Sequence, residues 1–194
     1  GDQVGDAGNF LGKGGVDRYS NAIAYQSPSV NNLCASVAFV PEEGKKDTGG
    51  IILGGEFSNE NIFVGLSNVN LKKGNATGGT DAQSTTQLLA NYKVSNALRL
   101  MTVYQNTSNL GYASTPKLTI IGAGVAYGFS PKTTVKAHYY QAGETVDKAK
   151  DGATMIAAGV DHALSDTTTA YIAYAGMTNE DKASYTSLNW GHGD

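Results

Sequence analysis

The side chains in this sequence that could do chemistry are three histidines and a set of charged residues carried on alternating segments. His138, His162 and His192 do not have the spacing of metal ligands, and no Gly-x-Ser-x-Gly elbow occurs. We therefore expect no catalytic centre, no metal and no cofactor. The charged residues offer a different chemistry, because lysines, arginines and carboxylates gathered on one wall create a field that orients polar solutes and ions.

The stretch from Gly124 to Tyr140, GVAYGFSPKTTVKAHYY, shows which kind of element carries these residues. Apolar residues occupy every second position before and after a turn at Ser130 to Lys132, which predicts a β-hairpin with two different faces. The pattern returns 35 residues later, where Gly159 and Val160 repeat Gly124 and Val125. The turn serines Ser95, Ser130 and Ser165 each follow an apolar residue, and Ser58 follows Phe57 in the same way. A hairpin repeated at this interval is predicted to be one unit of a larger closed sheet.

Composition favours β-structure and excludes some classes of function. Glycine (25 residues) and tyrosine (11) are abundant, and proline (4) is scarce. The net charge is only −3, so we expect no nucleic-acid partner, and the single cysteine, Cys34, permits no disulfide within the chain. No run approaches the roughly 20 apolar residues of a membrane helix. Alternating strands can nevertheless cross a membrane, since their mean hydropathy stays near that of a soluble protein.

About ten strands are expected in one domain covering residues 1–194, separated by short turns and longer loops in alternation. Short turns at one rim and long loops at the other are what a membrane barrel needs. The expected strands lie between residues 17 and 177, around 17–27, 33–39, 51–57, 62–66, 88–94, 98–104, 124–129, 135–140, 156–160 and 170–174. The long loops are expected at 41–48, 72–84, 106–115 and 144–152.

One face of these strands is apolar and contains no Lys, Arg, Asp or Glu. Its aromatic residues are expected near strand ends, as in the interfacial girdles of membrane barrels. The face comprises Leu88, Ala90, Tyr92, Val94, Leu100, Tyr104, Ile121, Ala123, Val125, Tyr127, Phe129, Val135, Ala137, Tyr139, Ile156, Val160, Ile172 and Tyr174.

The opposite face mixes charged and polar residues with glycine and alanine, which suits a wet lumen better than a packed core. Strand parity places six candidate pore-lining residues there: Glu56, Lys93, Arg99, Lys136, His138 and Asp161. Glu56 and Asp161 are expected to lie across the lumen from the bases, giving a transverse field. A soluble β-sandwich or a lipocalin-like barrel with ordinary solvated charges remains the alternative at this point.

The segment Asp17 to Pro28, DRYSNAIAYQSP, resembles the general porins of Gram-negative bacteria, especially those of the beta-proteobacterial type. The segments YGFSPKTT and HALSDTTTAYIAY are similar to that family's later strands. The resemblance implies a sixteen-stranded antiparallel transmembrane β-barrel in the outer membrane, assembled as a homotrimer. It also implies that Arg18 lines the pore. Ala24 departs from the family, which usually has a basic residue there.

Aligned on that family, residues 1–15 are the end of the loop that narrows the pore, the ten strands are the sixth to fifteenth, and residues 178–194 are an extracellular loop. The chain then corresponds to a fragment lacking five strands before it and one after it. The implied function is passive diffusion of ions and small hydrophilic solutes through a water-filled channel, without catalysis. The alternative is a non-conducting surface barrel or sandwich that acts as an adhesin or structural protein. Ion selectivity, the particular solute and the closure of the fragment stay open.

Overall fold

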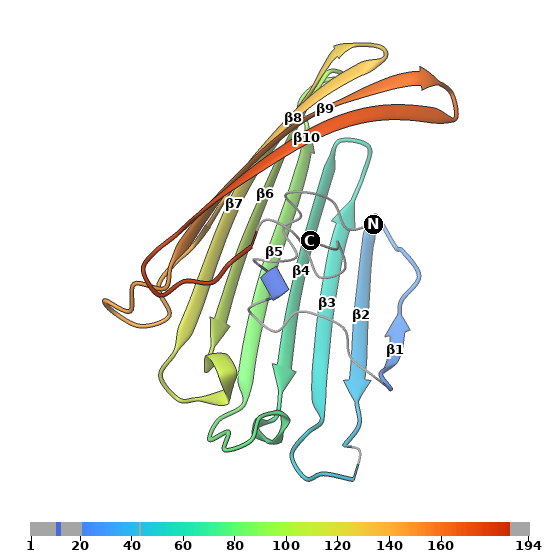
Figure 1. Ribbon diagram of the computed structural model, residues 1–194. Coiled ribbons are helices and arrows are strands. Elements are labelled where there is room, and N and C mark those ends of the chain that lie inside the picture. The colour runs from blue at the N-terminus through green and yellow to red at the C-terminus, as the bar shows by residue number, and fades with distance from the viewer. Residues whose placement is uncertain (1–10, 13–20, 43, 187–194) are drawn as a thin grey trace.

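The chain folds as one antiparallel sheet of ten strands in which every strand pairs with its neighbours in sequence, from β1 to β10 (Figure 1). The computed structural model describes residues 11–12, 21–42 and 44–186. Within these residues β1 and β10 each have one neighbouring strand, so the sheet remains open between them. The all-β antiparallel fold predicted from the alternation is confirmed.

The strands range in length from 4 residues in the first to 14 in the seventh. They are β1 (Ile23–Gln26), β2 (Leu33–Val40), β3 (Gly50–Ser58), β4 (Ile62–Leu71), β5 (Gln83–Lys93), β6 (Leu98–Ser108), β7 (Lys117–Ser130), β8 (Thr133–Ala142), β9 (Ala153–Ser165) and β10 (Thr168–Asn179). Two single turns of 3-10 helix, η2 (Lys73–Asn75) and η3 (Leu110–Tyr112), lie in the loops. Among the described residues no helix is long and apolar enough to cross a membrane.

Short turns and long loops alternate as expected, and they lie at opposite rims of the sheet (Figure 1). Several strands run further toward the long-loop rim than the sequence suggested. β6 continues to Ser108, although a loop was expected from Asn106, and β10 continues to Asn179, although the strands were expected to end at 177. Both extensions consist of polar residues. Their backbone groups form the hydrogen bonds of the sheet, but their side chains show no apolar alternation from which a strand could be predicted.

Side-chain hydrogen bonds fix the short turns. The Ser95 hydroxyl accepts from the amides of Ala97 (3.2 Å) and Leu98 (3.1 Å). The Ser130 hydroxyl accepts from the Lys132 amide (3.3 Å), and the Ser165 hydroxyl from the Thr167 amide (3.3 Å). A hydroxyl that replaces a backbone acceptor is the chemistry of an ST turn, so the recurring serine has a structural cause. At the β3–β4 turn the Asn59 side chain takes this part instead of Ser58.

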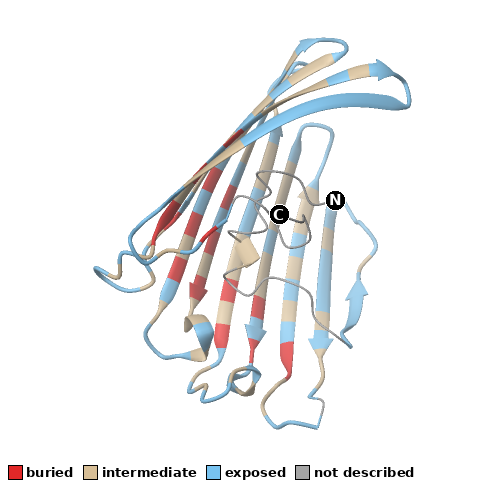
Figure 2. Ribbon diagram, in the orientation of Figure 1, coloured by how far each residue is buried: buried red, intermediate tan, exposed pale blue. Residues whose placement is uncertain are grey.

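The sheet curves so that β8 to β10 fold over toward the side on which residues 11–12 lie (Figure 1). Buried residues concentrate in the half of the sheet nearest the long loops, while both ends of β10 and all of β1 are exposed (Figure 2). The main buried cluster contains Leu118, Ile120, Ala142, Ala153, Met155 and Tyr185. Among the described residues, the packed core lies in the long-loop half of the sheet.

Candidate functional site: the concave face

Register assigns each side chain to a face, because antiparallel partners point to the same side and alternate along a strand. Lys93 pairs with Arg99, Arg99 with Ala126, and Ala126 with Lys136. His138 and Asp161 belong to the same face through their pairings with Gly124 and Thr134. The register of β3 with β4 and of β4 with β5 places Glu56 on this face as well. The six candidate pore-lining residues that lie in the described part of the chain therefore share one face of the sheet.

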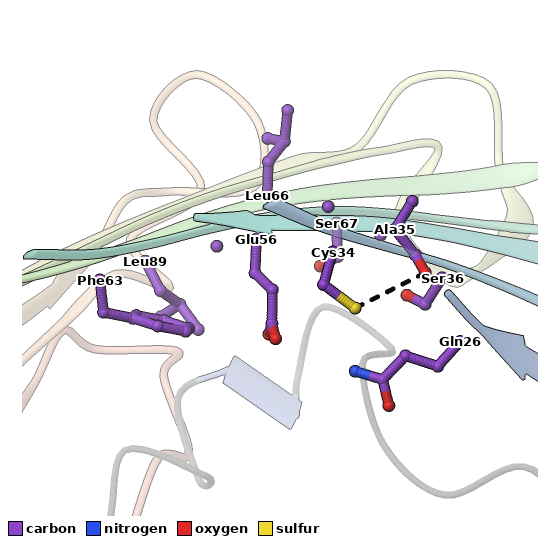
Figure 3. A pocket seen from close by; sticks show the side chains of 12 residues that line it. Gln26, Cys34, Ala35, Ser36, Glu56, Phe63, Leu66, Ser67 and Leu89 are labelled. Carbon is purple, nitrogen blue, oxygen red and sulfur yellow. Dashed lines mark hydrogen bonds between the residues drawn. The ribbon is translucent and has the colours of Figure 1, made fainter. Parts of the chain in front are cut away.

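This face is the concave one. Gln105, which has no exposed surface, shares the face with Arg99 and donates a hydrogen bond from Nε2 to the carbonyl of Leu11 at 3.0 Å. Figure 3 shows Glu56, Cys34 and Gln26 directed toward the side of the sheet that carries the Leu11 segment, whereas Leu66 points away from it. Charged and polar side chains therefore face the hollow side of the sheet, and Leu66 belongs to the opposite, convex side.

The convex face is an apolar belt. Its side chains are strongly exposed in the isolated chain, for example Leu100 (44%), Tyr127 (50%) and Ile172 (73%). Toward the long loops the belt ends in polar residues that bond to one another, such as Asn68 Nδ2 to Thr86 Oγ1 (2.9 Å). Asn106 Nδ2 likewise donates to Thr119 Oγ1 at 3.0 Å. An apolar band bordered by a polar rim is the outer surface of a membrane barrel.

The aromatic residues of the belt were expected near strand ends, and this is only partly correct. Tyr92 and Phe129 each lie next to the last residue of β5 and β7. Tyr104 and Tyr174 lie in the middle of β6 and β10, because those strands continue past the belt into the polar rim. The edge of the apolar belt, and not the end of a strand, decides where these rings lie.

Charge on the concave face is arranged differently from the expected transverse field. Lys136 and Asp161 lie diagonally on the neighbouring strands β8 and β9, and Lys136 Nζ and Asp161 Oδ2 form an ion pair. Asp161 is therefore beside Lys136 and not across the face from it, so the expectation for Asp161 was wrong. Parity identified the face but could not show which residues of adjacent strands meet.

Lys93 and Arg99 are direct cross-strand partners. Neither enters an ion pair within the part of the chain that the structure describes. Like charges placed opposite each other on a sheet destabilise it. This pair therefore forms a net positive site on the concave face, close to the short turns.

Aromatic rings lie flat against the concave wall where glycines leave room. The rings of His138 and Tyr140 are nearly parallel, at 4°, with centroids 6.1 Å apart. A Cβ on Gly124 would lie 2.6 Å from Nδ1 of His138, and a Cβ on Gly122 would collide with the ring of Tyr140. Small residues on this face were interpreted as leaving space in a wet lumen. At Gly122 and Gly124 that space is occupied by aromatic rings that lie against the sheet.

Glu56 lines a hollow of about 190 Å³ between β2 and β4, together with Cys34, Ser36, Phe63 and Leu89 (Figure 3). The Cys34 thiol donates to the carbonyl of Ser27 at 3.2 Å. Phe63 and Leu89 also line a second hollow on the same face, of about 250 Å³, whose lining includes His138, Tyr140 and Leu11. Larger apolar side chains thus lie on a face that was expected to mix charged and polar residues with glycine and alanine.

Sequence reasoning missed the apolar cluster that Leu118, Ile120 and Met155 form on the concave face near the long loops. The available signal was the run Leu118 to Ile121, which breaks alternation by placing apolar residues on both faces. Tyr185 covers the cluster, with its amide and carbonyl bonded to the Asn179 side chain at 3.2 and 2.9 Å. Burial, with a smaller contribution from the charge of Asp151, raises the pKa of Tyr185 to about 12.

The long loops are joined by exposed ion pairs outside the belt. Lys72 Nζ donates to Glu42 Oε1 at 2.6 Å, and this bond holds the pKa of the Glu42 carboxyl below its ordinary value. Lys150 and Asp181 pair at 3.0 Å and connect the β8–β9 loop to the segment after β10. Both contacts draw neighbouring loops together at the same rim.

Some sequence-based expectations lie outside the described residues. They are the pore residue Arg18, His192, and the segment 1–15 apart from Leu11 and Gly12. Among the residues that are described, no group of three His, Cys, Asp or Glu side chains could hold a metal ion.

Comparison with known proteins adds to this geometry. A statistical model of the Gram-negative porin family matches residues 1–182. The chain belongs to the Gram-negative porin family. No curated protein matched at a significant level. The resemblance read from Asp17 to Pro28 is thereby confirmed.

Solved porins share the fold of this porin sheet. The anion-selective porin from Comamonas acidovorans superimposes with a TM-score of 0.73 at 19% identity, covering 84% of this chain and 50% of that porin. A porin refined at 1.8 Å resolution gives a TM-score of 0.64 at 15% identity, covering 81% of this chain and 56% of its own. The chain therefore spans about half the length of the solved porins it matches.

Proposed function

We propose that this chain forms part of the wall of a water-filled channel, through which ions and small hydrophilic solutes cross the outer membrane by passive diffusion. The observation that carries the proposal is the division of the sheet into two faces. Lys93, Arg99, Lys136, Asp161 and Glu56 share the concave face, and the belt on the convex face is uncharged. A soluble barrel would direct its apolar face inward, which is the reverse of this arrangement.

The complete channel is a sixteen-stranded barrel in this proposal, the number that the family resemblance implies, and the ten described strands leave β1 and β10 with one partner each. Unpaired edges in a bilayer leave backbone groups without hydrogen bonds, so further strands must close the sheet. The family relationship supports assembly as a homotrimer in outer-membrane lipid. The part of the segment 178–194 that follows β10, from residue 180 on, forms an extracellular loop in this proposal.

The segment 1–15 narrows the channel in this proposal. Leu11 supports it, since its carbonyl accepts from the buried amide of Gln105 on the concave face and its side chain packs beside the Leu118 cluster. A loop held against the inner wall reduces the open cross-section. Pore-lining residues then include Arg18 from the family motif, and His138 with the charged residues of the concave face.

Selectivity follows from charge in the proposal. Lys136 and Asp161 compensate each other, which leaves Lys93 and Arg99 against Glu56 among these charged residues of the concave face. We expect a modest preference for anions, the property for which the Comamonas porin is named.

Single-channel recording in a planar bilayer tests the function. Stepwise ohmic currents after insertion of the intact channel protein are expected. Absence of any conductance from correctly folded, inserted protein would contradict the proposal and favour a non-conducting surface role.

A further inference from the structure

We propose that the concave face carries a binding site for small aromatic carboxylates, formed by the ring-sized hollow beside Tyr140 and the adjoining Lys93–Arg99 pair. The inference rests on the proposed channel function, because a solute reaches this face only through a water-filled lumen. It goes beyond that function by naming a class of solute that the wall retains.

The hollow has the size and lining that an aromatic ring needs. It measures about 250 Å³, and its side chains include Leu89, Met101 and Val103, with Phe63 at one side. An apolar cavity of roughly 150 Å³ is enough to hold benzene. A hollow of this kind gives no advantage to small inorganic ions, which need polar or charged contacts.

The far wall of the hollow presents flat ring faces. His138 and Tyr140 are aligned to within 4° and lie over Gly124 and Gly122, whose missing Cβ atoms allow the rings to approach the backbone. Phe63 lies in the same way over Gly65, where a Cβ would be 3.2 Å from Cζ of the ring. Planar solutes stack on such faces in offset or edge-to-face arrangements.

The positive pair adjoins the hollow along two strands. Leu89, Asn91 and Lys93 are successive concave positions on β5, and Met101 and Arg99 are successive ones on β6. Consecutive positions on one face are about 7 Å apart, a step that long basic side chains readily cover. A ring seated between Leu89 and Met101 thus has two cations and the Asn91 amide near the position of its carboxylate.

Charge decides between an aromatic anion and an aromatic cation. Glu56 lies on the opposite side of Phe63 and Leu89, in the smaller hollow of Figure 3. The ring-binding hollow thus has one carboxylate, Glu56, on one side and two bases, Lys93 and Arg99, on the other. The net positive charge favours an anionic solute in the hollow. An arginine also offers two parallel N–H groups to a carboxylate, which a single point charge does not.

The test uses the intact channel protein in planar bilayers, with phenylacetate added to a chloride solution. We expect phenylacetate to interrupt the current saturably, at concentrations about tenfold below those at which acetate or benzyl alcohol act, since each lacks one of the two contacts. Benzylammonium should act no better than benzyl alcohol. A channel that conducts but does not distinguish phenylacetate from acetate overturns this inference alone, whereas absence of conductance overturns the proposed function.

Variants locate the site. Arg99→Gln should raise the half-blocking phenylacetate concentration about tenfold, as expected for loss of a charge-assisted contact. Lys132→Gln, which removes one charge at the nearby β7–β8 turn, is the matched control and should leave that concentration unchanged. Leu89→Asn should weaken phenylacetate but not acetate, whereas Ala38→Asn, on the same face of β2, should change neither. Equal effects in variant and control, or stronger block by benzylammonium, would refute the site.

Discussion

Leu100 and Met101 are neighbours on β6 that face opposite sides of the sheet. The same substitution at each position therefore distinguishes a side chain that faces lipid from one that faces water. We predict that Leu100→Lys destabilises the inserted protein strongly and that Met101→Lys is tolerated. The two variants share strand, charge and side-chain length, so only the direction of the side chain differs.

The size of the difference follows from the position of Leu100 in the apolar belt. On β6 the belt runs from Leu98 to Tyr104, six residue steps that span roughly 20 Å along the strand, and Leu100 lies about 3 Å from its middle. A lysine facing lipid at the midplane of a barrel costs about 2–4 kcal/mol, and the cost falls toward zero near the interfaces. Leu100→Lys is therefore expected near that range. Met101→Lys faces the concave side, where its main cost is repulsion from Arg99.

The assay is reversible urea unfolding of the intact protein from lipid vesicles, with the free energy of unfolding compared between the two variants and the unaltered protein. A difference of about 2–4 kcal/mol corresponds to about 30- to 800-fold in the folding equilibrium. Equal destabilisation by both variants, or a larger effect of Met101→Lys, would refute the assignment of faces.

Three further predictions concern particular contacts. Asp161→Asn removes the partner of Lys136, so the reversal potential in a salt gradient should shift toward anion preference, and a shift toward cations would contradict the pairing. Gln105→Ala removes the buried donor to Leu11 and should cost about 1–3 kcal/mol of unfolding free energy, more than Asn106→Ala on the convex face; equal losses would speak against it. Burial favours the neutral phenol of Tyr185, so its stabilisation should be complete below its ordinary pKa of 10.0 and be lost as pH rises through about 12. The difference in tyrosinate absorbance between the unaltered protein and Tyr185→Phe, followed against pH, measures the pKa of Tyr185. A pKa near 10.0 would show that the ring is not buried.

Alternation in the sequence predicted the strands, their order of long and short connections and the shared face of Glu56, Lys93, Arg99, Lys136 and Asp161. It succeeded because an apolar belt permits only one register of faces, and a shift by one residue would put Lys93 or Lys136 into lipid. The recurring turn serines also had a direct structural cause, since Ser95, Ser130 and Ser165 each accept from an amide of their own turn.

Contacts between strands could not be read in the same way. Parity placed Lys136 and Asp161 on one face, but their ion pair depends on the stagger of β8 against β9, which pairs Thr134 with Asp161. The polar ends of β6 and β10 carry no alternation, and the burial of Tyr185 depends on a segment that folds back after β10. The hollow at Tyr140 is lined by residues of five strands, β4 to β8, so no single stretch of sequence indicated it.

Reaction of single cysteines along β6 with a membrane-impermeant, water-soluble thiol reagent tests the central assignment most directly. With native Cys34 replaced by serine, Arg99→Cys and Met101→Cys should react in the inserted channel, and Leu98→Cys and Leu100→Cys should be protected by lipid. Uniform reactivity, or protection of positions 99 and 101 with reaction at 98 and 100, would contradict a water-facing concave wall.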